Sequence, residues 1–404
     1  MYSLFLFLIL LEILIQFLFK KNKKVNSILI DKTDYNPLFD KNKFKNFLEN
    51  SFNKKLGWER KKNSTGFDLN NKKLIKFSID RRGHRKIFYN KKKKFFASFG
   101  DSYVFGRQVL DKETWQEQIA KSYNFNILNY GVGNYGFDQS LIKFKNTKLN
   151  KETKYIILGF VPETICRIQS HWKHYLEFGN IHAFKPFFVV KRGKLKLIPN
   201  PINKKTNINQ LKSIIQKTQK VDRFYKDKFQ KYIFKFPFFI SFIKNFSFNL
   251  RVFSMILLKE LKLIKVSKDE FQNILFSYSM KRNIVHSHKY YKDAKSILLF
   301  KKLIEEFKVT ALKKKKIPIL LILPQLMDLK LNSKKNYVNF FSTFKNELNV
   351  IDTTELLLKN LNKKIYTNDK YGGHFSKLGN KLISMYVYKK LKKIKKKNES
   401  YLQR

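Results

Sequence analysis

Cysteine is almost absent from this sequence of 404 residues, which contains Cys166 and no other cysteine. A single thiol cannot form an intrachain disulfide, and it cannot supply a zinc or iron–sulfur site built from cysteines. It also leaves the redox compartment undecided. The sequence has neither a Gly-x-x-x-x-Gly-Lys phosphate loop nor a dinucleotide-binding fingerprint. We therefore expect no cofactor and no metal.

Acidic residues are scarce too, with 30 Asp and Glu against 85 Lys and Arg, which gives a formal net charge of +55. Such an excess can bind nucleic acid or anionic lipid by releasing counterions. A nucleic-acid-binding protein usually concentrates its charge on one element or face, whereas lysine occurs here in every segment. We interpret the charge as a compositional bias and expect no nucleic-acid partner. Attraction of the basic surface to anionic membrane lipid would be a by-product of this bias.

The apolar content is high enough for a large core, since 43% of the residues are hydrophobic and 16% aromatic. The chain is long enough for one large domain or two ordinary ones. Changes in composition divide it into an apolar N-terminal segment, a connector with a short β-rich region, the first part of a sheet domain, an insertion, the second part of that domain, and a polar tail. These segments span residues 1–19, 20–94, 95–169, 170–293, 294–395 and 396–404.

Residues 1–19 are apolar apart from Ser3, Glu12 and Gln16. As a helix they would be about 28 Å long, close to the thickness of the hydrocarbon layer of a bilayer. A cleaved signal peptide would have a basic start and a small-residue cleavage site, and neither is present. The segment therefore predicts a single-pass membrane anchor. The lysines at 20, 21, 23 and 24 would place the main domain in the cytoplasm by the positive-inside rule.

Five short apolar runs have the length of buried strands. They cover residues 95–99, 127–129, 155–160, 317–323 and 350–352. Between them, residues 115–120, 139–148 and 294–311 carry apolar side chains at helical spacing. Strands that alternate with helices predict a parallel α/β sheet covered on both sides. Ligands of such sheets bind at the carboxyl ends of the strands.

The alternation breaks in the insertion, residues 170–293. Residues 187–190 and 196–198 flank a Lys-Arg-Gly turn and predict a β-hairpin, and a Lys- and Phe-rich helical stretch follows that includes residues 234–263. We interpret the insertion as a cover for a site. Its aromatic residues at helical spacing are typical of ordinary core, and a face lying on a membrane is the alternative. In the preceding β-rich region, Gly66 and Arg82-Gly83 are turn signals.

Gly100-Asp101-Ser102 directly follows the first predicted strand. A strand, a tight turn and a helix together present backbone N–H groups that stabilise a developing anion. A serine there can attack a carbonyl carbon if a base lies nearby. For the tripeptide alone, a turn with an Asp or Ser helix cap is the alternative.

Residues 99–106 resemble the first block of the SGNH (GDSL) hydrolases, which are esterases and acyl-transfer enzymes. The resemblance implies a three-layer α/β/α flavodoxin-like sheet with Ser102 as nucleophile. Residues 129–139 resemble the second block, N-x-G-x-x-G, whose last glycine donates a backbone N–H to the oxyanion hole. Gly131 and Gly133 lie in this loop, and the donor position falls on Asn134, a residue type that tolerates left-handed backbone conformations. A glycine-rich loop before a helix is the alternative.

The third block departs from the family. The family usually has an asparagine there that donates to the oxyanion, whereas Glu163 stands at about that position. A carboxylate cannot donate, so either another residue fills this role or Glu163 faces elsewhere. Arg167, one helical turn further, either pairs with Glu163 or holds an anionic group of the substrate, and both interpretations stay open.

Residues 368–380 resemble the family's fifth block, which implies that His374 is the catalytic base. The family has an aspartate three residues before this histidine, and Tyr371 occupies that position. Asp369 lies five residues before it, and the Gly372-Gly373 pair would let the loop bring Asp369 to the ring as the third member of a triad. The alternative is a Ser-His dyad whose ring is oriented by a backbone carbonyl.

We expect no functional role for the other histidines. His171 and His174 have a spacing that suits a metal on a helix, but no Asp, Glu or Cys nearby completes a ligand set. We interpret both as surface histidines, and His286 and His288 as incidental.

The resemblance covers roughly residues 95–165 and 294–395. It implies a serine esterase or O-acyltransferase, with O-acetyl groups on a cell-envelope saccharide as the natural substrate class. That role would place the domain outside the cytoplasm, against the charge rule. The alternative is a catalytically inactive SGNH-like module that binds saccharide or membrane, which the missing asparagine and the displaced aspartate favour. A membrane-tethered nucleic-acid-binding protein is supported by the charge alone.

Overall fold

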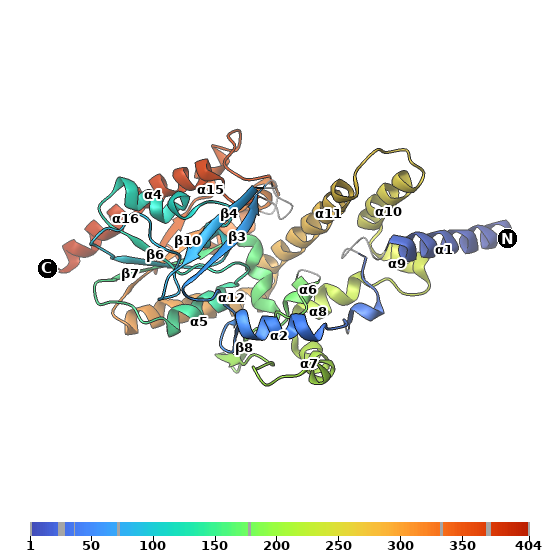
Figure 1. The fold of residues 1–404 in the computed structure, drawn as a ribbon, viewed down its shortest axis with the longest axis horizontal. Helices are drawn as coiled ribbons and strands as arrows, with labels where there is room; N and C mark the ends of the chain where they lie inside the picture. The colour runs from blue at the N-terminus through green and yellow to red at the C-terminus, as the bar shows by residue number, and fades with distance from the viewer. Residues whose placement is uncertain are drawn as a thin grey trace.

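The structure is a computed structural model that describes residues 2–22, 29–35, 37–70, 73–176, 179–331, 334–368 and 373–402. The molecule is elongated (Figure 1). A sheet with its covering helices and the C-terminus forms one end. Three helices, α1 (Tyr2–Asn22), α9 (Phe238–Lys244) and α10 (Phe246–Glu260), lie with the N-terminus at the other end.

The central sheet consists of β5 (Phe96–Phe99), β6 (Ile127–Asn129), β7 (Tyr155–Phe160), β10 (Ile317–Ile322) and β11 (Asn349–Asp352). All neighbouring strands are parallel, and they lie in the order β6-β5-β7-β10-β11. In chain order this is 2-1-3-4-5, the flavodoxin-like arrangement. It confirms the predicted fold class, and each of the five apolar runs forms one of these strands.

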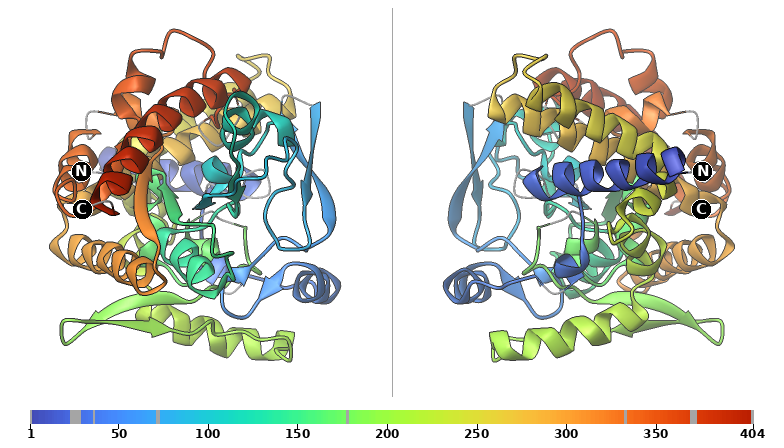
Figure 2. Two further views of the ribbon diagram at one scale, coloured as in Figure 1. Left: turned by 90° about the vertical axis from the view of Figure 1, so that its left-hand side faces the viewer. Right: turned by 90° about the vertical axis from the view of Figure 1, so that its right-hand side faces the viewer.

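Helices cover both faces of this sheet (Figures 1 and 2). Along β7, Ile156 and Leu158 belong to one core cluster, whereas Tyr155 and Ile157 belong to the other. Side chains of a strand point alternately to its two faces, so a strand that is apolar throughout requires a helix layer on each side. The first layer contains α5 (Phe137–Asn146), α12 (Ala294–Lys313) and α14 (Lys334–Ser342), and the second contains α4 (Trp115–Ser122), α15 (Thr354–Leu358) and α16 (Lys377–Leu402).

Two small antiparallel pairs precede the sheet, after η2 (Lys32–Tyr35) and α2 (Lys41–Asn50). They are β1 (Phe52–Asn53) with β2 (Gly57–Trp58), and β3 (Ser64–Asn70) with β4 (Lys73–Ile79). Gly83 lies in a turn, but the prediction of a turn at Gly66 is wrong, because Gly66 lies inside β3 opposite Phe77. A Cβ atom on Gly66 would lie 2.3 Å from the Phe77 ring. This glycine makes room for the ring of its cross-strand neighbour.

The segment between β7 and α12 is mostly helical, as expected. It contains an antiparallel hairpin of β8 (Phe187–Lys191) and β9 (Lys194–Ile198). The helices are η4 (Pro162–Gln169), α6 (Lys173–Leu176), α7 (Ile208–Val221), α8 (Arg223–Asp227), η5 (Phe229–Tyr232), α9, α10, α11 (Lys268–His288) and η6 (Lys289–Lys292). A buried ion pair between Lys185 and Asp138 on α5 fixes this segment to the sheet domain. A second link joins His288 Nε2 to Asp328 Oδ1 on α13 (Leu326–Lys330), at 2.6 Å.

Helix α1 is long and apolar enough to cross a membrane by length and composition. A signal sequence near an N-terminus would pass the same test. Its second half is packed against protein, since Ile15, Leu18 and Phe19 are buried in a cluster with residues of α9, α10 and α11.

Changing Asp293 to asparagine should weaken the junction between α8 and α12. Asp293 caps α12 by accepting from Ser296 N at 2.7 Å, and its two oxygens lie 2.7 and 2.8 Å from the Arg223 guanidinium. The hydrogen bonds from Arg223 hold the pKa of Asp293 well below its usual range. A lowered folded-state pKa stabilises the protein above the unfolded pKa of about 3.9, and this stabilisation is lost as the pH falls through the folded value.

Asparagine keeps the cap but loses the charge, so we expect a loss of about 1 kcal/mol in the free energy of unfolding at neutral pH. Urea denaturation from pH 7 down to pH 3 measures the difference between the two proteins. The difference should shrink below about pH 4. A difference that does not vary with pH would contradict the ion-pair explanation.

Candidate active site

Ser102 lies at the start of α3 (Ser102–Phe105), directly after β5 and its Gly100-Asp101 turn. Asp101 is the cap of this short helix, and its Oδ1 accepts from Tyr103 N at 2.9 Å. Ser102 is 5% exposed. The strand and the cap together present the hydroxyl at the carboxyl edge of the sheet, where the sequence predicted it.

His374 reaches Ser102 from the loop before α16. The distance between His374 Nε2 and Ser102 Oγ is 3.0 Å, although 272 residues separate the two in the chain. His374 is 5% exposed, and its ring lies against the ring of Tyr103, with 4.9 Å between the centroids. This is the hydrogen bond that a serine nucleophile and its base require.

Hydrogen bonds to backbone groups hold the loop that carries His374. The His374 N–H donates to Thr367 Oγ1 at 3.0 Å, and the His374 carbonyl accepts from Thr367 N at 2.7 Å. Thr367 in turn donates to Gln108 Oε1 at 2.7 Å, and the Tyr103 hydroxyl donates to the carbonyl of Gly373 at 2.6 Å. Sequence reasoning missed these three side chains. Only the position of Tyr103, next to the nucleophile, pointed to one of them.

The predicted acid of the triad, Asp369, lies outside the described residues, as do Tyr371 and Gly372. Within the described part, Asp101 is a buried carboxyl whose charge interacts with His374. Burial raises the pKa of Asp101, and Arg167, the Tyr103 N–H and His374 act in the opposite direction. Asp101 therefore adds a buried acidic group beside the Ser-His pair.

The predicted oxyanion loop follows β6 and lies beside α3. Asn134 has a φ of 68°, in the left-handed region that the glycine of the family's block would adopt easily. Gly131 N donates to Asn129 Oδ1 at 3.0 Å, and the Gly133 carbonyl accepts from Trp58 Nε1 at 3.1 Å. Among the described residues, no hydrogen bond occupies the backbone N–H of Ser102 or of Asn134. Neither donor is thus occupied by an acceptor in the described part of the protein.

Glu163 and Arg167 lie on η4, which follows β7. One guanidinium nitrogen of Arg167 is 3.8 Å from Glu163 Oε2, and the other is 3.7 Å from Asp101 Oδ2. Arg167 also donates to the carbonyl of Tyr135 at 3.0 Å. Arg167 thus joins η4 to the Gly100–Ser102 turn and to the loop after β6. Its nearness to Glu163 agrees with the ion-pair interpretation.

These groups meet where ligands of such sheets bind. The strand order reverses between β5 and β7, and the residues after β5, β6 and β7 lie at one edge of the sheet. The crevice outside the carboxyl ends at such a reversal is the usual ligand site of an open α/β sheet. Ser102, Asn134 and Glu163 follow these three strands.

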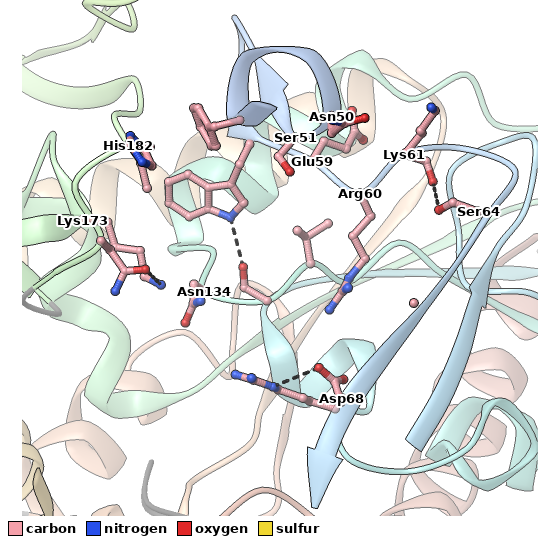
Figure 3. A pocket seen from close by; sticks show the side chains of 18 of the residues that line it. Asn50, Ser51, Glu59, Arg60, Lys61, Ser64, Asp68, Asn134, Lys173 and His182 are labelled. Carbon is pink, nitrogen blue, oxygen red and sulfur yellow. Dashed lines mark hydrogen bonds and ion pairs between the residues drawn. The ribbon is translucent and has the colours of Figure 1, made fainter. Parts of the chain in front are cut away.

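A cavity of about 560 Å³ opens beside the oxyanion loop, and Asn134 and Gly133 are part of its wall. Figure 3 shows Lys173 and His182 on one side of it and Arg60, Lys61 and Ser64 on the other. Its wall also includes the aromatic side chains of Phe47, Trp58 and Phe77. Ser102 and His374 do not line this cavity.

Three of the other histidines, His171, His174 and His288, are buried. His171 and His174 are buried, so the prediction of surface histidines is wrong, and burial lowers their pKa to about 3 and about 4. His174 Nε2 lies 3.0 Å from the carbonyl of Asp34, and Gly179 N donates to its Nδ1 at 3.1 Å. These rings take part in packing. His288 is a buried partner of Asp328 rather than incidental.

Comparison with known proteins gives little. No protein-family model and no curated protein matches the chain. Among solved structures, the chain is similar to a two-domain esterase active on acetylated mannans, co-crystallised with mannopentaose, with a TM-score of 0.32 and 11% sequence identity. The match covers 74% of this chain and 49% of that one, so this chain spans about half the length of that protein.

Proposed function

We propose that the protein is a serine hydrolase or acyltransferase of the SGNH (GDSL) kind that acts on acyl esters. The observation that carries this proposal is the 3.0 Å contact between Ser102 Oγ and His374 Nε2. Asn134 has a left-handed backbone conformation, and in the described part of the chain no hydrogen bond occupies the N–H groups of Ser102 and Asn134, so these two groups could hold an oxyanion. The flavodoxin-like strand order puts these groups at the ligand-binding edge.

The geometry supports a two-step acyl transfer. Ser102 Oγ attacks the ester carbonyl carbon while His374 Nε2 takes the hydroxyl proton, and the N–H groups of Ser102 and Asn134 stabilise the oxyanion. The bond to the leaving alcohol breaks as that oxygen receives the proton from His374. Water or an acceptor hydroxyl then attacks the acyl-enzyme and loses its proton to His374. Ser102 is released when its oxygen takes that proton back.

Within this class, we propose an acylated saccharide as substrate, with O-acetyl as the acyl group. Saccharides bind through aromatic faces combined with polar groups, and the cavity beside Asn134 offers Trp58 and Phe47 together with Asn50, Asp68 and Arg60. A saccharide held there would lie next to the oxyanion loop. An envelope substrate would place the sheet domain outside the cytoplasm, with α1 as its anchor.

One observation favours a second candidate, a catalytically inactive binding module. Where the family has an oxyanion-donating asparagine, this chain has Glu163, whose carboxylate lies 3.8 Å from Arg167. A carboxylate at that position would repel an oxyanion rather than stabilise it. The binding module would keep the cavity and lose the chemistry.

A fluorophosphonate probe separates the two candidates. The full-length protein is incubated with the probe, digested and mapped by mass spectrometry. We expect one adduct, on Ser102, and none on Ser277, an exposed serine of α11 that acts as an internal control. If Ser102 stays unmodified in a protein with a native circular-dichroism spectrum, the hydrolase proposal fails and the binding module replaces it.

A further inference from the structure

The end of the molecule opposite the sheet is covered by exposed apolar side chains on α1, α9 and α10, which we call the three-helix end (Figure 1). On α1 these are almost all of residues 2–10, followed by Ile13, Leu14 and Phe17. On α9 and α10 they are Ile240, Ile243, Phe246, Leu250 and Leu257, and Leu261, which directly follows α10, is exposed as well. A soluble protein rarely exposes so much contiguous apolar surface without a partner for it.

Helix α1 is not independent of the other two helices. Phe19 stacks on Phe234 with 5.0 Å between ring centroids and lies 5.5 Å from Phe238. Ile15 and Leu18 are buried in the same cluster as Val252 of α10. Figure 2 shows α1 running beside α10. Removal of α1 as a signal sequence would uncover this cluster, so the packing favours a helix that stays in place.

The exposed part of α1 is too short to cross the hydrocarbon layer without the part that packs on α9 and α10. Residues 2–10 are exposed on all sides, but as a helix they span only about 14 Å, half of the roughly 30 Å hydrocarbon layer. To cross the layer, α1 must also immerse residues 11–19, whose buried side packs on α9 and α10. If α1 stops in one leaflet, the same packing holds α9 and α10 beside it there.

The polar groups of this end suit a membrane. Glu12 would be costly in hydrocarbon on an isolated helix, but its two oxygens accept from Phe238 N and Phe239 N at 2.5 and 2.6 Å. Residues 234–263 contain one acidic residue, Glu260, and it pairs with Lys21 at the end of α1. The other charged residues of 234–263 are all basic. Such a balance attracts anionic lipid head groups.

We infer that α9 and α10 enter the membrane together with α1, and that the three-helix end is the membrane-bound part of the protein. The occupant of its exposed face is the bilayer: hydrocarbon against Leu250 and its neighbours, and anionic head groups against the basic side chains. Arg251, exposed on α10, reaches the head groups with its long side chain.

This assignment also places the candidate active site. Helix α11 follows α10, is 21 residues and so about 31 Å long, and packs against η4, which carries Glu163 and Arg167. Its last residue, His288, is tied to Asp328. The three-helix end is therefore joined to the site by a helix fixed at its far end, which holds the site at a set height above the membrane.

Site-specific fluorescence tests the inference on the full-length chain. Leu6→Cys on α1, Leu250→Cys on α10 and Leu378→Cys on α16 each add a thiol at an exposed position, while the native Cys166 is buried. Each variant is labelled with an environment-sensitive dye and mixed with vesicles of phosphatidylcholine and phosphatidylglycerol. The unsubstituted chain serves as the labelling blank, and circular dichroism confirms that each variant is folded.

We expect the dyes at positions 6 and 250 to shift to shorter emission wavelengths, to be quenched by doxyl-labelled lipid and to be protected from aqueous iodide. The dye at position 378 should show none of these changes. Insertion of position 6 with position 250 still open to iodide would overturn the inference, because α1 would then act alone. Failure of both positions to insert into pure lipid would also overturn it, in favour of a protein partner for this surface.

Discussion

The Ser102→Ala variant is expected to hydrolyse a soluble model acetyl ester on the order of 10⁴-fold more slowly than the unchanged protein, or slower still. Its side chain loses the oxygen that forms the acyl-enzyme, so only binding and the oxyanion loop remain to assist water. Ser102 lies at a helix start with a cap from Asp101, and alanine is accepted at such a position. The loss should therefore appear in kcat with the fold unchanged.

His374→Ala should cost about as much, because the two side chains act through one hydrogen bond of 3.0 Å. For groups that act as a unit, the losses do not add. We expect the Ser102→Ala/His374→Ala double variant to be as slow as either single variant. Initial rates at several ester concentrations give kcat/KM for all three proteins.

Matched controls come from α11. Ser277→Ala and His286→Ala change the same residue types on that helix and should keep ester hydrolysis close to the native rate. Losses that multiply in the double variant would show that Ser102 and His374 act separately. A Ser102→Ala protein with near-native rates would remove Ser102 from the chemistry.

The fold was predictable because its signal is local. Each central strand, such as Ile156 to Leu158 in β7, is apolar on both faces, and the covering helices α4, α5 and α12 repeat their apolar residues at helical spacing. The position of Ser102 was predictable for a similar reason, since it follows its strand directly. His374 was found by its motif, and its contact with Ser102 depends on a sheet that brings the two loops to one edge.

What could not be predicted depends on contacts between distant residues. Nothing in the sequence near Thr367 or Gln108 indicates that they hold the His374 loop, because their partners lie far away in the chain. The same holds for Arg167, whose ion pair with Asp101 crosses from one strand end to another. The burial of His171 was missed because a loop histidine has no pattern that reveals what covers it.

The second large effect is expected from a substitution in the predicted oxyanion loop, where two glycines, Gly131 and Gly133, lie two residues apart. A Cβ atom on Gly131 would lie 2.3 Å from Phe105 N and 2.9 Å from the carbonyl carbon of Val104, both backbone atoms of α3. A Cβ atom on Gly133 would meet no atom within 4 Å. Because α3 carries Ser102, Gly131→Ala must move either the loop or the helix that starts at Ser102.

We expect Gly131→Ala to lower the free energy of unfolding by about 1–3 kcal/mol, the usual cost of overpacking. It should also slow fluorophosphonate labelling of Ser102 by about 100-fold, since a displacement of about 1 Å costs that much in a positioned site. Gly133→Ala should change the unfolding free energy by less than about 0.5 kcal/mol and leave labelling intact. Urea denaturation and the labelling rate measure both effects. If the two variants behave alike, the loop does not lie against the nucleophile helix, and Asn134 loses its place as the second oxyanion donor.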